Sequence, residues 1–179
     1  MNEITRFFSD KMSTPLGPAI LIADESGALR MFFWEDQDTS WRTAFERRHV
    51  GAEVIPRRDP FGHVAALTRY FEGEIAALDG IVVAYAGTPF QEKVWNALRS
   101  IEVGTTLSYG GLARRIGEPK AVRAVGVANA SNPIGIVVPC HRVIGSDGRL
   151  TGYGGGLPRK RWLLDHEFRH SPWRLERTA

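Results

Sequence analysis

IGIVVPCHRVI, residues 134–144, is the stretch on which the predicted fold and chemistry both depend. Its β-branched Val and Ile residues favour a buried strand, and Pro139 would end that strand because proline has no N–H to donate. The sequence therefore predicts a short, rigid strand with Cys140 at its end, followed directly by His141 and Arg142. Such neighbours favour the thiolate, which is the nucleophilic form of cysteine. Cys140 is thus a candidate nucleophile, and the alternative for a lone cysteine is a small buried hydrophobe.

The composition of the chain excludes several classes of protein. Of its 179 residues, 43% are apolar and 24% charged, as in an ordinary soluble globular protein. The single cysteine allows no internal disulfide and no thiolate metal cluster, which fits a reducing cytosol. We find no charged-then-apolar leader and no apolar run near the ~18 residues that a membrane span needs. We therefore expect a cytoplasmic protein of one domain or two small ones.

Charge is divided unevenly along the chain. Residues 1–87 carry 9 Lys and Arg against 13 Asp and Glu, whereas residues 88–179 carry 14 against 7. A basic half beside an acidic half indicates that the basic half faces a polyanion. A solvated surface with uneven charge is the alternative.

Residues 1–86 are predicted to form a small α+β domain. The predicted elements are a hairpin with strands 19–23 and 29–34, helices 43–49 and 63–74, and a strand 81–85. No titratable side chains cluster here as a catalytic site would require. This domain is therefore expected to be a scaffold.

Residues 87–179 are predicted to form a second, mostly helical domain. Its predicted helices begin at Pro89 and extend over 109–116, 121–130 and 158–168. Thr88 and Ser108 precede the first two as helix caps. The tight turn at 117–120 joins two short helices, which is the pattern of a helix-turn-helix.

The helix over 121–130 offers few side chains for reading base edges in the major groove. Only Arg123 and Asn129 are polar. The residues around them are small, namely Ala121, Ala124, Gly126, Ala128 and Ala130. Small residues allow close approach and one long cation can enter a base stack, so the helix favours the minor groove of double-stranded DNA with weak sequence preference. An ordinary solvated charge is the alternative for Arg123.

Two loops flank the candidate nucleophile. Asn132 and Pro133 form a turn between the predicted second helix of the helix-turn-helix and the Cys140 strand. The loop over 151–156 is rich in glycine, which allows close backbone approach to a ligand. Tyr153 in this loop is a candidate pocket wall, and a flexible linker is the alternative.

The last predicted helix carries two further features. Arg159, Lys160 and Arg161 crowd its first turn, where the helix dipole disfavours cations, and this hints at an anionic partner. A solvated face is the alternative. Glu167 near its end could form a surface ion pair or orient a histidine.

A series of motifs along the chain matches one known family in order and spacing. They are TPLG (14–17), YFEGE (70–74), GTPFQ (87–91) with VW (94–95), SY (108–109), AVRAVG (121–126), NP (132–133), PCHRV (139–143), GYGGG (152–156) and WLL (162–164) with Glu167. The chain resembles the O6-alkylguanine-DNA alkyltransferases, also called methylated-DNA–protein-cysteine methyltransferases, in their bacterial form. The resemblance is strong from about residue 87 to residue 168 and weaker before.

The resemblance implies an α/β fold and a suicide reaction. Residues 1–86 would be a ribonuclease-H-like domain without catalysis of its own, and residues 87–179 would bind DNA and hold the alkyl acceptor. The alkyl group of O6-alkylguanine, and as a further candidate that of O4-alkylthymine, would move irreversibly to Cys140 without cofactor or metal. His141 would take the thiol proton through a water, and Glu167 would orient that histidine.

The resemblance also assigns a pocket for a base flipped out of the duplex. Its predicted residues are Tyr109, Val143, Tyr153, Gly154 and Gly155. Tyr109 would hydrogen-bond the base and help neutralise the leaving guanine. The carbonyls of Cys140 and Val143 would accept the exocyclic amine, and the N–H of Gly154 would face O6.

The predicted partner is double-stranded DNA, with no membrane, no obligate protein partner and a monomeric state. The predicted contacts are Ala121, Arg123, Ala124, Gly126, Ala128 and Asn129. Arg123 would take the place of the flipped base. Asn132, counted among the catalytic residues, would tie the recognition helix to the predicted active-site strand.

Other readings of the sequence remain open. A non-enzymatic, alkyltransferase-like protein would bind alkylated DNA without reacting, and Cys140 argues against it because such proteins lack the acceptor. A helix-turn-helix regulator conflicts with the scarcity of base-reading side chains over 121–130. A Cys-His hydrolase lacks a marked oxyanion hole but is not excluded.

Overall fold

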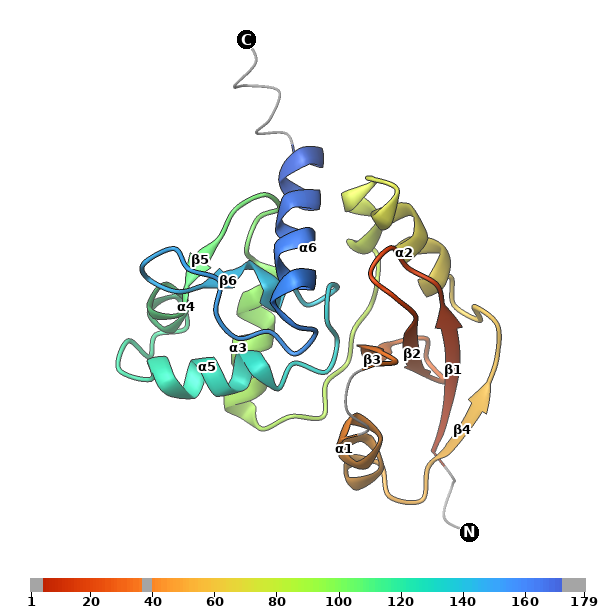
Figure 1. Cartoon of the computed structure of the whole chain (residues 1–179). Coiled ribbons are helices and arrows are strands. Elements are labelled where there is room, and N and C mark those ends of the chain that lie inside the picture. The colour runs from red at the N-terminus through yellow and green to blue at the C-terminus, as the bar shows by residue number, and fades with distance from the viewer. Residues whose placement is uncertain (1–4, 37–39, 172–179) are drawn as a thin grey trace.

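A four-stranded sheet forms the N-terminal half of the molecule (Figure 1), and the computed structural model describes residues 5–36 and 40–171. The strands are β1 (Arg6–Met12), β2 (Ala19–Asp24), β3 (Leu29–Trp34) and β4 (Glu53–Pro56). Their spatial order is β3-β2-β1-β4, in which β1 pairs antiparallel with β2 and parallel with β4. β2 and β3 are antiparallel neighbours, so the predicted hairpin is confirmed.

Side chains alternate across this sheet and give it two apolar faces. The helices of this half are α1 (Ser40–Arg48) and α2 (His63–Phe71), followed by the 3₁₀ turn η1 (Ile75–Leu78). Leu21 and Trp34 belong to the large core that includes side chains of α2. Ile22 and Phe33 belong to a separate cluster with Phe45 of α1. Both helices predicted for this half are confirmed, and they contribute to different clusters.

The predicted strand over 81–85 is wrong. Only Val83 pairs with the sheet, at Leu29 of β3. Further along β3, Phe32 pairs with Ile134 from the C-terminal half. Two segments thus share one strand, and each has room for a single bridge rather than a ladder.

The predicted strand before Cys140 is also wrong. Ile134 makes its one bridge to the sheet, and the chain then turns, with Ile136 in the left-handed region at φ 68°. The Val138 N–H bonds back to the Ile134 carbonyl at 2.9 Å. The β-branched side chains of this run are buried in the core, so the pattern indicated burial rather than a strand. Cys140 instead begins a 3₁₀ turn, η2 (Cys140–Arg142).

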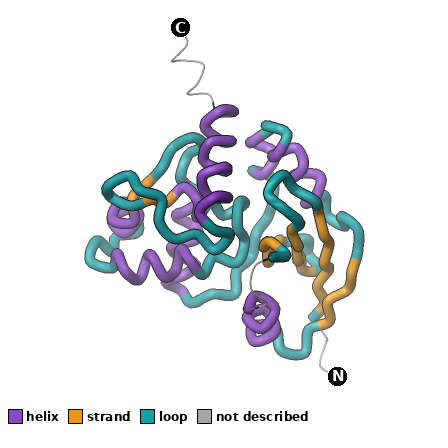
Figure 2. Tube along the Cα trace, viewed as in Figure 1, coloured by secondary structure: helices purple, strands orange, loops and turns teal. Residues whose placement is uncertain are grey.

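Helices around two short strands form the C-terminal half (Figure 2). In chain order they are α3 (Pro89–Arg99), β5 (Leu107–Ser108), α4 (Tyr109–Arg115), α5 (Val122–Ala130), β6 (Val143–Ile144) and α6 (Leu157–His170). Thr88 and Gln91 form a capping box at the start of α3, each side chain accepting from the backbone N–H of the other. α4 and α5 form the predicted helix-turn-helix.

The pairing of β5 with β6 sets the position of α4 relative to Cys140. Leu107 pairs in parallel with Val143, directly after η2. Ser108 then caps α4 by accepting a hydrogen bond from the Gly111 N–H. Tyr109, the first residue of α4, is therefore held near the chain that leaves η2.

One apolar core runs through both halves of the molecule. It joins Leu21 and Phe32 of the sheet to Val94 of α3 and Leu163 of α6. α6 stands between the two lobes and faces α2 (Figure 1). Within the described part of the chain, no helix combines the length and apolarity needed to cross a membrane.

Candidate active site

Cys140 lies buried at the start of η2, with 7% of its surface exposed. Burial raises the pKa of its thiol, although a hydrogen bond from the Asn132 side chain and the charge of Lys160 act in the opposite direction. The expectation that its basic sequence neighbours yield a ready thiolate is therefore wrong, because desolvation penalises the charged form more strongly. The thiol requires a base at the moment it reacts.

His141 is held as such a base would be. It is fully buried, and its Nε2 lies 2.9 Å from Oε1 of Glu167 on α6. Its Nδ1 makes no hydrogen bond to the residues that the structure describes. One ring nitrogen is thus oriented by a carboxylate while the other can receive a proton, as in a nucleophile–base–carboxylate site.

Arg142 and Glu167 form a buried, forked ion pair. The guanidinium donates from Nε to Oε2 at 2.8 Å and from Nη2 to Oε1 at 2.9 Å. Its Nη1 donates to the Ile101 carbonyl at 2.5 Å. Burial by itself would raise the pKa of Glu167, but His141 and Arg142 outweigh it and hold that pKa well below its ordinary value. Glu167 is therefore a carboxylate, as an orienting role requires.

Tyr70 joins this cluster from the N-terminal half, which the sequence predicted to be only a scaffold. It is fully buried on α2, and its hydroxyl donates to Oε1 of Glu167 at 3.0 Å. In the sequence Tyr70 lies on the apolar stripe of a helix, where a tyrosine resembles an ordinary core residue. Only the fold brings it to Glu167, 97 residues away.

Two asparagines fasten the loop that carries Cys140. Asn132 donates from Nδ2 to the Val138 carbonyl at 2.7 Å and accepts at Oδ1 from the Ile134 N–H at 3.0 Å. Asn129 of α5 lies with Nδ2 3.5 Å from the Cys140 carbonyl. Both residues thus connect the end of α5 to the loop that carries Cys140, residues 133–140, which we call the reactive loop.

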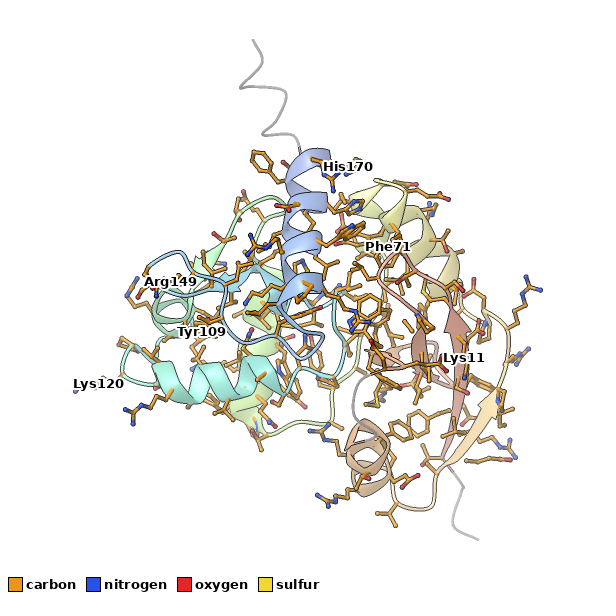
Figure 3. All side chains as sticks on the ribbon, viewed as in Figure 1. Lys11, Phe71, Tyr109, Lys120, Arg149 and His170 are labelled. Carbon is orange, nitrogen blue, oxygen red and sulfur yellow. The ribbon has the colours of Figure 1, made fainter. Side chains whose placement is uncertain are left out.

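Tyr109 and Tyr153 also lie close to the reactive loop. The Tyr109 hydroxyl donates to the Thr151 carbonyl at 3.3 Å (its position in the helical half is seen in Figure 3). The Tyr153 ring meets the His141 ring edge-on, with centroids 6.5 Å apart. Burial and the nearby Cys140 raise the pKa of Tyr153 well above its ordinary value.

Gly155 is required by packing against the sheet. A Cβ at this position would lie 2.6 Å from Nε1 of Trp34 and 2.7 Å from Cε1 of Tyr153. Gly154, in contrast, is exposed. The loop over 151–156, called the glycine loop below, thus packs against the N-terminal half at Gly155. This packing disfavours the flexible-linker alternative.

Arg159 and Lys160 have their partners within the protein, so the anionic partner inferred from the first turn of α6 is wrong for these two residues. Lys160 is fully buried, and its Nζ donates to the carbonyls of Val143 and Thr151, each at 2.6 Å. Burial lowers the pKa of Lys160 to about 8. Arg159 lies over the Trp34 ring, 4.6 Å from its centroid. Lys160 therefore joins β6 to the glycine loop, a role that its sequence position does not reveal.

α5 lies at the outer edge of the helical half (Figure 1). Of the residues predicted to touch DNA, four are at least partly exposed, namely Ala121, Arg123, Ala124 and Gly126. Within residues 5–36 and 40–171, Arg123 makes no hydrogen bond or ion pair. Ala128 and Asn129 are only 2% and 3% exposed, so their predicted DNA contacts are wrong. They face the core instead, where Nε1 of Trp95 donates to the Ala128 carbonyl at 2.8 Å.

The chemistry available at this site is transfer of a group to sulfur. A base removes the thiol proton, and the thiolate attacks an electrophilic carbon while a carboxylate orients the base. In the described part of the chain, no group of three or more His, Cys, Asp or Glu side chains could hold a metal ion.

Two family models match the chain. The ribonuclease-like domain of 6-O-methylguanine DNA methyltransferase matches residues 8–85, and the DNA binding domain of the same protein matches residues 89–169. Together they cover both halves of the described structure.

Similar proteins span nearly the whole chain. The methylated-DNA–protein-cysteine methyltransferase of Salmonella typhimurium is 48% identical over 168 residues, which cover 90% of this chain and 96% of that protein. That of Methanosarcina acetivorans is 43% identical, covering 86% and 94%. A crystal structure of Mycobacterium tuberculosis OGT in complex with DNA has 40% identity and a TM-score of 0.76, covering 95% of this chain and 97% of that one. The chain belongs to the family of methylated-DNA–protein-cysteine methyltransferases.

Proposed function

We propose that this protein repairs alkylated DNA by moving the alkyl group from O6 of guanine to its own Cys140. The observation that carries the proposal is the buried Cys140–His141–Glu167 arrangement next to a helix-turn-helix whose Arg123 is exposed and has no partner among the described residues. The sulfur–carbon bond forms as the carbon–O6 bond breaks, and the thioether does not revert. Each molecule therefore reacts once. O4-alkylthymine is a second substrate to be tested.

The proton balance of this reaction follows from the site. The Cys140 proton passes through a water to Nδ1 of His141, the nitrogen without a partner in the described residues. Glu167 stabilises the resulting imidazolium from the other side. The departing guanine takes one proton from the hydroxyl of Tyr109, and the proton held by His141 returns to Tyr109 through solvent. The net products are the alkylated cysteine and guanine.

The damaged base must leave the duplex for its O6 substituent to meet the sulfur. In this proposal Arg123 fills the gap from the minor groove, while Ala121, Ala124 and Gly126 allow the helix to approach closely. Tyr109, Tyr153, Val143, Gly154 and Gly155 form the pocket for the base. The domain boundary near residue 87, a monomeric state and a cytoplasmic location belong to the same proposal.

Mass spectrometry after incubation with O6-methylguanine duplex tests this function. We expect the Cys140 peptide to gain one methyl group, and Cys140→Ala to bind the same DNA without gaining any. A wild-type protein that binds the damaged duplex and stays unmodified would instead support the non-enzymatic, alkyltransferase-like alternative.

A further inference from the structure

Tyr70 is held at both ends by consecutive residues of α6. Its hydroxyl donates to Oε1 of Glu167 at 3.0 Å, and its backbone carbonyl lies 2.7 Å from Nε2 of His166. Its ring packs edge-on against the rings of Phe71 and His166. α2 and α6 face each other across the two halves, and Figure 3 labels Phe71 on α2 and His170 on α6. A side chain fixed in this way has one orientation, with the hydroxyl aimed at the carboxylate.

The hydroxyl of Tyr70 shares its acceptor with the proposed base. Oε1 of Glu167 accepts hydrogen bonds from the Tyr70 hydroxyl and from Nη2 of Arg142, and it lies next to Nε2 of His141. Oε2 accepts from Nε of Arg142. Every hydrogen bond donated to a carboxylate disperses its charge. The hydroxyl therefore weakens the hold of Glu167 on a proton at His141, and it also fixes the oxygen that orients the ring.

We propose that Tyr70 is a positioning residue through which the N-terminal half sets the basicity and orientation of the His141–Glu167 pair. This inference rests on the proposed function and goes beyond it, because it gives the ribonuclease-like half a part in the chemistry. The charged and titratable groups that face the cluster are Arg142 and His141 from η2, Tyr153 from the glycine loop, and His166 from α6.

Tyr70→Phe removes the hydroxyl and keeps the ring. The lost hydrogen bond no longer fixes the Glu167 oxygen that orients the His141 ring. The rate constant for alkyl transfer should therefore fall about tenfold, which is the size of effect expected for one hydrogen bond to a charged group. The loss should be equal on damaged duplex and on free O6-benzylguanine, since the change affects the base rather than DNA binding. With the charge of Glu167 less dispersed, the carboxylate attracts a proton on its ring partner more strongly, so the acid limb of the rate–pH profile should move to higher pH.

Tyr85→Phe is the matched control. Tyr85 packs on Trp95 with ring centroids 5.3 Å apart, and its buried hydroxyl has no hydrogen-bond partner among the described residues. Its rate and pH profile should equal those of the wild type. A Tyr70→Phe protein with an unshifted acid limb, or one that behaves like Tyr85→Phe, would overturn the inference. In a Glu167→Gln background the further change Tyr70→Phe should alter the rate less than about twofold, because the shared acceptor charge is already lost.

A titration by NMR keeps this inference separate from the proposed function. In protein labelled with ¹⁵N-histidine, the His141 ring signals should titrate at higher pH in Tyr70→Phe than in wild type, whether or not alkyl transfer occurs. An unchanged titration contradicts the role of Tyr70. A wild-type protein that shows the titration difference but never alkylates Cys140 contradicts the proposed function alone.

Discussion

At the scale of single residues, the site is organised around Glu167 rather than around the sulfur. The side chains of His141 and Arg142 follow Cys140 in the sequence, yet both bond the carboxylate on α6. Their adjacency to Cys140 in the sequence predicts an activated thiolate. The structure instead places the His141 ring against Glu167, and burial raises the pKa of the Cys140 thiol.

The exposed side chain of Arg123 on α5 can be tested by removing it. Its side chain is exposed and unpaired within the described residues, as expected of a group that enters DNA when a base leaves it. We expect Arg123→Ala to slow transfer from duplex DNA on the order of 10- to 100-fold, because an unstacked base then has no replacement. Reaction with free O6-benzylguanine should keep its rate. Both rates are measured by mass spectrometry under single-turnover conditions.

The control for Arg123→Ala is Arg69→Ala, which removes one exposed cation paired to Glu74 at the end of α2. It should leave both rates unchanged. Equal losses on duplex and free base in Arg123→Ala would show that Arg123 acts on the chemistry rather than on base displacement.

At the scale of elements, the helices and the β2–β3 hairpin were predictable from the sequence, whereas the strands predicted over 81–85 and before Cys140 did not form. The capping signals at Thr88 and Ser108 are local, and both helices begin where those residues place them. The apolar runs at 81–85 and 134–138 are also clear, but a strand needs a free partner edge. Both segments pair with the same strand, β3, and each forms only one bridge to it. The local sequence does not show that two segments compete for one strand edge.

The glycine loop provides the element-scale prediction. Because a Cβ at Gly155 would meet both Trp34 and Tyr153 below 3 Å, Gly155→Ala must displace the loop that walls the proposed base pocket. We expect a loss of ~1–3 kcal/mol in the free energy of unfolding and slower alkyl transfer. Gly80→Ala is the control, since a Cβ there meets nothing within 4 Å. Chemical denaturation measures the free energy of unfolding, and single-turnover experiments measure the transfer rate. Equal values for the two variants would refute the packing argument.

At the scale of the whole molecule, the two halves share one apolar core, and side chains from both meet around the candidate site. Trp34 and Tyr70 of the N-terminal half reach Gly155 and Glu167 of the C-terminal half, and Phe32 pairs with Ile134 at the start of the reactive loop. The predicted α/β class and helix-turn-helix are confirmed. The roles of Tyr70 and Lys160 could not be predicted, because each acts on groups that only the tertiary fold brings near.

The pH dependence of stability provides the prediction at this scale. The folded state lowers the pKa of Glu167. Below about pH 5 the unfolded state therefore binds more protons than the folded state, and the free energy of unfolding decreases as the pH decreases. Glu167→Gln removes this contribution, and its stability should fall less steeply from pH 6 to pH 3. Denaturant titrations at each pH measure the slopes. The exposed change Glu72→Gln should keep the wild-type slope, and an equally steep Glu167→Gln curve would argue against a strongly stabilised carboxylate.

A stoichiometric titration measures whether Cys140 accepts one alkyl group irreversibly. Wild-type protein is incubated with a large excess of duplex carrying O6-[³H-methyl]guanine until transfer stops, and protein-bound label is counted per mole of active protein. We expect a plateau at one methyl group per molecule, all of it on Cys140. Continued release of unmodified guanine beyond one equivalent, or label on any residue other than Cys140, would contradict it.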